Sequence, residues 1–449
     1  MRQASLVLVL GALWMTTLQG NAFAQTPAEM KVSGDWQIDV VCRTENGAQV
    51  KATLSVKAPE ATNVTDERYA TLPVYNPKAP GWTRGARLTG VRAFECTTRH
   101  ALDPASVKIR SAAGADATLF ERGKDYEMDG EWGTLGRVAG GRIADQQPVV
   151  INYQYVKARL DSVVLTRAGE LALRPGEPHI ATPLPATLAE GDIRVGNVYI
   201  SGRRLAKLDA DCLFPILEAA YPEPPKPAQS AAEQLLPNAL KKLRDGQRLK
   251  ILAWGDSVTQ GGFIAVDDRW QAQFVKRLKE RFPKADIELV TQGWGGKNTS
   301  SFLSAPPGHE HNYKEKVLGV RPDLIVSEFV NDAGLNPQQV EERYGNLLAD
   351  FKAIGAEWII LTPHYVYGEW MGLSRQREID DDPRPYVKGL RAFTEQHKIA
   401  LADAALRYGR LWRQGIPYIS MMTNTLNHPD ARGMALFADA LIALFPWRD

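Results

Sequence analysis

A proline-rich segment, Tyr221-Pro-Glu-Pro-Pro-Lys-Pro227, divides this 449-residue chain into two parts that follow different patterns. Proline lacks the backbone N–H that helices and sheets use, so the segment predicts a stiff, extended linker. A chain of this length has room for roughly two or three domains. We therefore expect one domain over residues 25–215, a linker with a lead-in helix over residues 216–245, and a second domain over residues 246–449.

The part before the linker has the pattern of short strands. Apolar and polar residues alternate in Val149–Tyr155, and further β-rich runs lie at Asp161–Thr166 and Asp192–Ile200. Turn-forming residues cluster between such runs, as in Asp129–Gly133. Short strands separated by turns predict an all-β domain, either a sandwich or a barrel.

The part after the linker alternates between strand and helix patterns. Large apolar residues recur at every fourth position from Trp270 to Phe282, which places them on one face of a helix. Apolar runs at Leu249–Trp254 and Glu357–Leu361 have the length of buried strands. This alternation predicts an α/β domain with a parallel sheet covered by helices on both faces. Ligands of such sheets bind beyond the carboxyl ends of the strands.

Four polar motifs of this second part supply the groups that acyl transfer needs. Ser257 ends a small turn directly after an apolar run, a position that suits a nucleophile. The glycine-rich Gln292–Lys297 offers backbone N–H groups, and Phe329–Asp332 contains a side-chain amide, so both could stabilise an oxyanion. The histidine of Asn427–Pro429 could take the serine proton as a general base.

In this order and spacing, the four motifs resemble the conserved blocks of the SGNH (GDSL-type) hydrolase family, over roughly Leu249–Phe445. The resemblance implies a flavodoxin-like, three-layer fold and a reaction without metal or organic cofactor. It also implies that Ser257 is the nucleophile and His428 the general base. The oxyanion donors would be the N–H of Ser257, the N–H of Gly296 and the side-chain amide of Asn331.

The chain departs from the family pattern at two positions. Phe329 stands where the third block usually has glycine. Thr425, preceded by Asn424, stands three residues before His428, where the family usually has an aspartate. We therefore expect a Ser-His dyad, with the imidazole N–H bonded to a backbone carbonyl or to Asn424. The alternative orienting group is Asp403, which follows a short apolar run.

Three further residues are candidates for the substrate site. Trp294 and Trp370 have the flat apolar area that stacks on sugar rings. His364 follows the strand that ends at Leu361, so it could face the same cleft and compete with His428 as the base. The histidines of His309-Glu-His311 lack an obvious third ligand, and we expect no metal site there.

The first residues predict a signal peptide over residues 1–24. Arg2 precedes the apolar Leu6–Leu13, and Ala22-Phe-Ala24 has the small residues of a cleavage site. The apolar run is shorter than the about 20 residues that a membrane span needs. We expect an exported protein, periplasmic or secreted, without a membrane span.

Charge and cysteine content narrow the remaining possibilities. The formal net charge of +2 and the absence of a dense basic run argue against nucleic-acid binding. An oxidising compartment would allow one disulfide among Cys42, Cys96 and Cys212, with Cys42–Cys96 the most plausible pair. Buried, unpaired thiols are an equally good interpretation. The sequence does not indicate the oligomeric state.

Together these features predict an exported serine esterase that hydrolyses a small acyl ester, most plausibly an acetyl group on a carbohydrate. The arrangement is similar to that of family carbohydrate esterases that carry an N-terminal β-sandwich and lack the acidic triad member. Two other functions fit the sequence. One is an acyltransferase of the same fold, and the other is a noncatalytic glycan-binding protein of the cell envelope.

Overall fold

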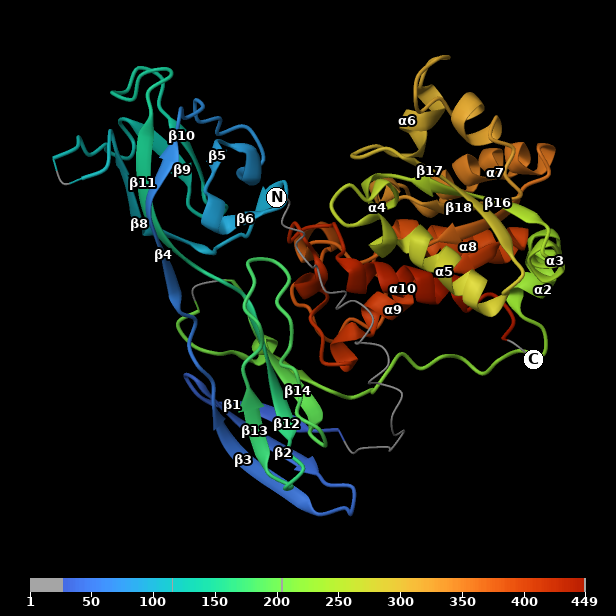
Figure 1. The fold of residues 1–449 in the computed structure, drawn as a ribbon, viewed down its shortest axis with the longest axis horizontal. Helices are drawn as coiled ribbons and strands as arrows, with labels where there is room; N and C mark the ends of the chain where they lie inside the picture. Colours follow the sequence, from blue (N-terminus) through green and yellow to red (C-terminus); the bar gives the residue numbers. More distant parts are fainter. Residues whose placement is uncertain (1–26, 115, 203–204, 448–449) are drawn as a thin grey trace, which may run out of the picture.

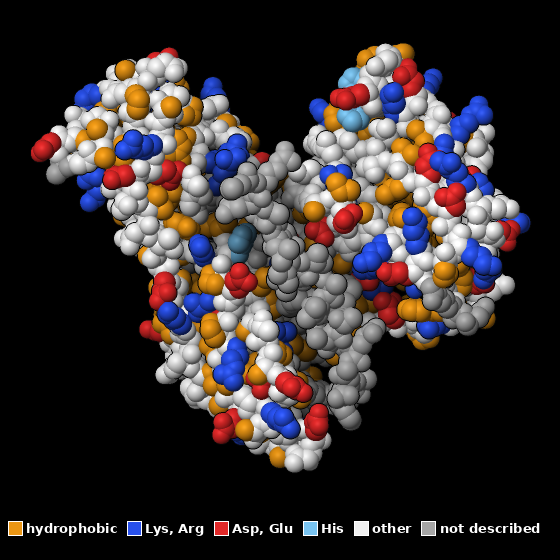
Figure 2. All heavy atoms as spheres, viewed as in Figure 1, with side chains coloured by type: hydrophobic (Ala, Val, Ile, Leu, Met, Phe, Trp, Pro, Cys, Tyr) orange, Lys and Arg blue, Asp and Glu red, His pale blue; other side chains and the backbone are white. Residues whose placement is uncertain are grey.

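A computed structural model describes residues 27–114, 116–202 and 205–447 of the chain. An antiparallel β part and an α/β part are joined by a long extended connection (Figure 1). The predicted signal peptide lies outside the described residues. Within the described ranges, no helix has the length and apolar character needed to cross a bilayer. Acidic and basic side chains are interspersed over both parts on the face shown in Figure 2.

The lower lobe of the β part contains two facing sheets, in the strand orders β1-β2-β3 and β13-β12-β14-β15. Side chains of β2, such as Ile38 and Val40, share one buried cluster with Val163 of β12 and Val198 of β14. Every second residue of β2 is therefore buried, as expected for a strand with one face in the core. The strands are β1 Glu29–Gly34, β2 Gln37–Arg43, β3 Gln49–Ser55, β12 Arg159–Leu165, β13 Leu171–Arg174, β14 Ile193–Ile200 and β15 Leu213–Pro215.

The upper lobe has its own core between the sheets β4-β11-β8 and β5-β10-β9. Ile109 of β8 and Ile151 of β11 pack in one cluster with Met128 of β9 and Leu135 of β10. A separate short hairpin, β6-β7, lies beside this lobe. The strands are β4 Ala61–Tyr69, β5 Ala86–Arg87, β6 Arg92–Ala93, β7 Cys96–Thr97, β8 Leu102–Arg110, β9 Tyr126–Asp129, β10 Thr134–Arg137 and β11 Val149–Val156.

The expected all-β fold is confirmed, but its residues form two separate cores instead of one sandwich or barrel. This division also shows that the Cys42–Cys96 pairing was wrong. Cys42 belongs to the core of the lower lobe, whereas Cys96 packs in a cluster beside the upper lobe. All three cysteines are free and buried.

The α/β part is built on a five-stranded parallel sheet in the order β17-β16-β18-β19-β20. Its strands are β16 Arg248–Gly255, β17 Asp286–Gly293, β18 Leu324–Glu328, β19 Glu357–Leu361 and β20 Ala400–Ala402. Its helices are α2 Ala231–Leu235, α3 Pro237–Asp245, α4 Ser257–Gln260, α5 Trp270–Arg281, α6 Thr299–Ser304, α7 Pro337–Ala353, α8 Pro385–His397, α9 Ala404–Gly409 and α10 Ala431–Ile442.

The central strand β16 is buried on both faces, and its alternate side chains enter two different clusters. Ile251 and Ala253 face the cluster that contains residues of α5 and α10. Leu252 and Trp254 face the cluster that contains residues of α7 and α8. Helices therefore cover both faces of the sheet, which confirms the predicted three-layer α/β fold (Figure 1).

The strand order creates a site for ligands at the end of β16. The chain passes from β16 to β17 on one side and later returns to β18 on the other side. The loops beyond these strands consequently diverge, and such a switch point leaves a crevice at the carboxyl edge of the sheet. The turn Gly255-Asp256-Ser257 stands at this point.

The β part and the α/β part share buried side chains. An interface cluster is formed by residues of both parts, namely Trp82, Cys96, Trp132, Tyr367 and Leu426. A second contact lies lower, where Trp412 of the α/β part packs with Tyr199 and Phe214 of the lower lobe. The ion pair Arg99–Glu369, at 2.5 Å, also joins the two parts.

Candidate active site

Ser257 begins α4 directly after the turn that ends β16. Gly255 is required there, because an added Cβ would lie 2.2 Å from the backbone oxygen of Glu328. Asp256 is fully buried and caps the short helix by accepting a 3.1 Å hydrogen bond from the N–H of Val258. Its other oxygen accepts a 2.9 Å bond from the N–H of Asn331. Asp256 therefore connects the serine turn to the segment that follows β18.

His428 meets Ser257 from the loop that precedes α10. The ring nitrogen Nε2 of His428 lies 3.1 Å from the Oγ of Ser257. The imidazole is stacked on Phe263, with ring centroids 4.3 Å apart and an interplanar angle of 3°. Only 12% of its side chain is exposed. A hydroxyl and an imidazole in this geometry can exchange a proton directly.

The other two motifs lie beside the serine. A Cβ added to Gly295 would be 3.9 Å from the Cβ of Ser257, so the glycine-rich segment passes close to that side chain. The next residue, Gly296, is exposed and has a φ of 69°, which favours glycine. Asn331 donates from Nδ2 to the backbone oxygen of Lys297, at 3.1 Å. The structure thus brings together Ser257, His428 and the segments that carry Gly296 and Asn331.

The second ring nitrogen of His428 lies against a residue that the sequence did not indicate. Its Nδ1 is 2.8 Å from Oε1 of Glu95, which belongs to the hairpin turn between β6 and β7 in the β part. Burial alone would raise the pKa of Glu95, but the nearby imidazole of His428 and the amide of Asn424 outweigh it. The pKa of Glu95 is therefore lowered, and its carboxylate stays ionised.

The three predicted orienting groups have other partners. The Oδ1 of Asn424 accepts hydrogen bonds from the backbone N–H groups of residues 426, 427 and 428, and its Nδ2 donates to Glu95 at 2.7 Å. These bonds shape the loop that carries the imidazole. Thr425 donates to the backbone oxygen of Thr97, at 3.4 Å.

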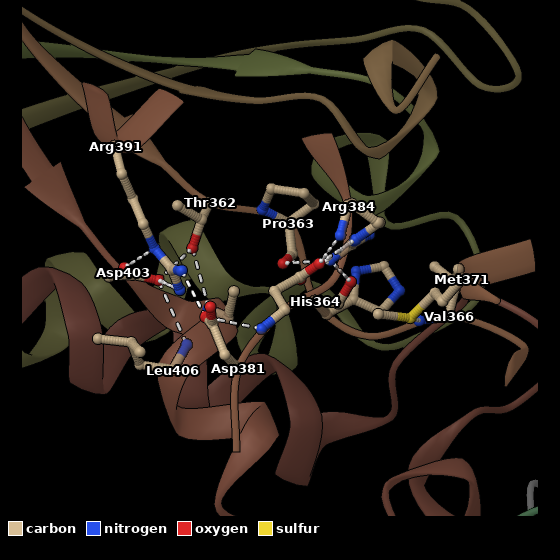
Figure 3. A network of polar contacts seen from close by, with 12 residues as sticks. Thr362, Pro363, His364, Val366, Met371, Asp381, Arg384, Arg391, Asp403 and Leu406 are labelled. Carbon is tan, nitrogen blue, oxygen red and sulfur yellow. Dashed lines mark hydrogen bonds and ion pairs between the residues drawn. The ribbon is translucent and has the colours of Figure 1, made fainter. Parts of the chain in front are cut away.

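Asp403 is engaged away from the imidazole. Its carboxylate binds Arg391 at 2.7 Å and Thr362 at 3.1 Å, and it caps α9 through the N–H of Leu406 (Figure 3). A carboxylate held by these three groups already has its hydrogen bonds satisfied. Glu95, and not Asp403, is the carboxylate that faces His428.

The expectation that His364 faces the substrate cleft was wrong. His364 is completely buried, and its Nε2 lies 2.9 Å from the backbone oxygen of Asn427. Burial, followed by the nearby charge of Arg384, holds the pKa of this imidazole well below its usual value (Figure 3). A neutral, buried ring in this position supports the loop that carries His428.

The two candidate tryptophans lie in different surroundings. Trp294 is half-buried and stacked with His311, with centroids 4.6 Å apart and an interplanar angle of 19°. Trp370 is 51% exposed and lies 6.1 Å from Trp82 of the β part, measured between ring centroids. Within the described residues, no group of three or more potential metal ligands is present.

Residues 253–436 match the sequence model of the GDSL-like lipase/acylhydrolase family. No curated protein sequence matches the chain.

Three of the similar solved structures are esterases or acylhydrolases. A two-domain esterase active on acetylated mannans is 18% identical, with a TM-score of 0.38 and coverage of 46% of this chain and 51% of that one. An acetyl xylan esterase is 20% identical, with a TM-score of 0.33 and coverage of 43% and 97%. A lipase/acylhydrolase from Enterococcus faecalis is 23% identical, with a TM-score of 0.33 and coverage of 43% and 93%.

The chain spans about half the length of the two-domain esterase to which it is similar. The family match begins at Ala253 within β16, ends at Leu436 within α10, and includes the loops of Ser257 and His428. The α/β part of this chain therefore matches the GDSL-like lipase/acylhydrolase family over most of its length, at residues 253–436.

Proposed function

We propose that this protein is an exported serine esterase that removes a small acyl group, most plausibly acetyl, from a carbohydrate. The observation that carries the proposal is the 3.1 Å separation between His428 Nε2 and Ser257 Oγ at the switch point of the sheet. The match of residues 253–436 to an acylhydrolase family supports the same reaction.

In the proposed mechanism, His428 takes the proton of Ser257 while Oγ attacks the ester carbonyl carbon. The negative charge that develops on the carbonyl oxygen is stabilised by the N–H groups of Ser257 and Gly296 and by the side-chain amide of Asn331. Each such donor typically lowers the barrier by about 3–4 kcal/mol. The protonated imidazole then gives its proton to the leaving alcohol, and water hydrolyses the acyl-enzyme.

The carbohydrate preference rests on aromatic side chains near the boundary of the two parts. Trp370 is exposed, and Trp82 lies beside it, so a sugar ring would find flat apolar area there. Phe94 is 48% exposed and lies edge-on to His428, at 6.4 Å between ring centroids. Large rings this close to the imidazole favour a small acyl group over a long chain. Export rests on the predicted signal peptide.

A panel of p-nitrophenyl acyl esters and acetylated glycans tests the proposal. We expect acetate release by the wild-type protein and none above background by Ser257→Ala. A phosphonofluoridate should label the wild type at Ser257 and leave the alanine variant unlabelled. Transfer of acetate to an added glycan acceptor would instead identify an acyltransferase. Wild-type protein that neither turns over an ester nor is labelled would contradict both enzymatic functions.

The general base is tested by His428→Ala. Removal of the group that accepts the serine proton should lower kcat for p-nitrophenyl acetate at least about a hundredfold. The fold should be retained, because His428 lies in a loop and belongs to neither a helix nor a strand. Steady-state kinetics and circular dichroism measure the two effects. A variant with near-normal kcat would show that another group takes the proton.

A further inference from the structure

The imidazole of His428 lies between a serine from one part of the chain and a carboxylate from the other. The Oε1 of Glu95 lies 2.8 Å from Nδ1, although without the alignment of a full hydrogen bond. The second oxygen, Oε2, is buried and lacks a hydrogen-bond partner. Thr425 stands where the family usually has the acidic residue that orients the histidine. That position therefore supplies no carboxylate, and Glu95 is available to take the role.

The backbone around this contact is held in an unusual conformation. The pairs Arg92–Thr97 and Ala93–Cys96 close the hairpin, so that Phe94 and Glu95 form its two-residue tip. Phe94 has a φ of 49°, in the left-handed region that bulky residues avoid. Across the interface, the β-branched Thr425 has a φ of 60°. Such strained residues cost about 1–3 kcal/mol each and persist where the surrounding structure fixes them, often at functional sites.

Packing fixes the hairpin against the loop of the histidine. Cys96, next to Glu95, shares the interface cluster with Leu426, which lies two residues before His428. Thr425 binds the backbone of Thr97 directly, and Arg87 donates to the backbone oxygen of Glu95. The carboxylate and the imidazole are therefore positioned by a shared, buried framework.

We propose that Glu95 is the positioning residue for His428, so that the β part completes a Ser257–His428–Glu95 triad. This inference rests on the proposed function. The carboxylate holds the proton on Nδ1, which leaves the lone pair of Nε2 directed at Ser257, and it stabilises the imidazolium that forms as Oγ attacks. Glu95 stays ionised throughout and takes no proton. The β part thus belongs to the active site and is more than an appended binding module.

Two variants at this position separate the effects of charge and tautomer. In Glu95→Gln, the Asn424 amide should keep an oxygen facing Nδ1, so the tautomer is retained while the charge is lost. Glu95→Ala removes both. We expect kcat for p-nitrophenyl acetate to fall at least about tenfold in the glutamine variant and about a thousandfold in the alanine variant, with KM nearly unchanged. Glu95→Asp should recover part of the loss.

A readout independent of turnover is the ¹⁵N NMR signature of the His428 ring. We expect the Nδ1–H tautomer in the wild type and in Glu95→Gln, and a mixture in Glu95→Ala. The matched control is Glu369→Gln, which removes an ion pair between the same two parts at a 63% exposed side chain. It should keep wild-type kcat and tautomer.

The two proposals fail in different ways. If the wild type hydrolyses esters and Glu95→Ala keeps kcat within about twofold of it, the role of Glu95 is wrong while the esterase function stands. An unchanged tautomer in Glu95→Ala would also overturn it. If the wild type hydrolyses no ester, the proposed function fails, and the NMR comparison still tests whether Glu95 orients the ring. Should Glu95→Ala fold poorly, the better-matched Glu95→Gln and Glu95→Asp carry the kinetic test.

Discussion

At the scale of single residues, this site depends on the missing Cβ of Gly255. Gly255 precedes the serine turn where the backbones of β16 and β18 approach each other, and only a hydrogen fits there. Asp256 then uses both carboxylate oxygens to tie this turn to the backbone at Val258 and Asn331. The position of Ser257 therefore depends on the backbone contacts that its two preceding residues make.

Gly255→Ala tests this dependence. The added methyl group would lie 2.2 Å from the backbone oxygen of Glu328, which cannot move without displacing β18. We expect a loss of about 1–3 kcal/mol in the free energy of unfolding, together with a fall in kcat. Urea denaturation and ester hydrolysis measure the two effects. Gly262→Ala is the control, because no atom lies within 4 Å of its added Cβ. Equal behaviour of the two variants would contradict the argument.

Residues also show what the sequence could and could not predict. Ser257 and His428 each stand in a local motif whose neighbours identify it, so both could be chosen without a structure. Glu95 stands in an ordinary hairpin turn, and its role depends on the packing of one part of the chain against the other. His364 had the right position after a strand, but its ring turns into the core and binds the backbone of Asn427.

At the scale of elements, the parallel sheet places buried carboxyl groups beneath the serine turn. Glu328 ends β18, is completely buried, and neither of its oxygens has a hydrogen-bond partner. Burial, followed by the nearby Asp256, raises the pKa of Glu328 well above its usual value. Burial likewise raises the pKa of Asp256 to about 7. This pair of buried carboxyl groups therefore keeps a proton that the unfolded chain releases.

This gives the stability of the protein a pH dependence with a definite sign. Because the folded state keeps a proton on Glu328 that the unfolded chain loses above its ordinary pKa, rising pH lowers the free energy of unfolding. Glu328→Gln removes that titration. We expect the variant to gain stability relative to the wild type between about pH 5 and pH 8 in urea denaturation. The exposed Glu342→Gln on α7 is the control, and a variant curve parallel to the wild-type curve would contradict the prediction.

The elements themselves were largely predictable from local chemistry. The spacing of Trp270, Phe274 and Leu278, four residues apart, identified the buried face of α5. Pro237 interrupts the lead-in helix as its missing N–H requires, so that α2 ends at Leu235 and α3 begins at the proline. The division of the β part into two lobes was not predictable, because strand patterns show which faces are buried and not which sheets share a core.

At the scale of the whole molecule, the interface cluster connects the fold of one part to the chemistry of the other. Leu426 lies two residues before His428, is 2% exposed, and packs with Cys96 and Trp132. The same loop receives support from His364 on its other side. The packing of the two parts against each other therefore helps to fix the distance between Ser257 and His428.

Leu426→Ala tests this coupling. Loss of a buried leucine should lower the free energy of unfolding by about 2–5 kcal/mol. Because the cluster fixes the loop of the histidine, kcat should also fall about tenfold or more, since small displacements of catalytic groups have large effects on rate. Leu303→Ala on α6 provides the control, at a side chain that is 45% exposed. A stability loss without any change in kcat would show that the cluster only holds the parts together.

The reactivity of the three unpaired thiols can show which part of the folded chain opens first. Burial raises the pKa of Cys96 and of Cys212 to about 12 and also raises the pKa of Cys42, so little reactive thiolate is present while the cores are intact. Cys42 and Cys212 report on the lower lobe, whereas Cys96 sits beside the hairpin tip that faces the imidazole. An alkylating dye would therefore distinguish detachment of the hairpin from melting of the lobe, by which cysteine is modified first.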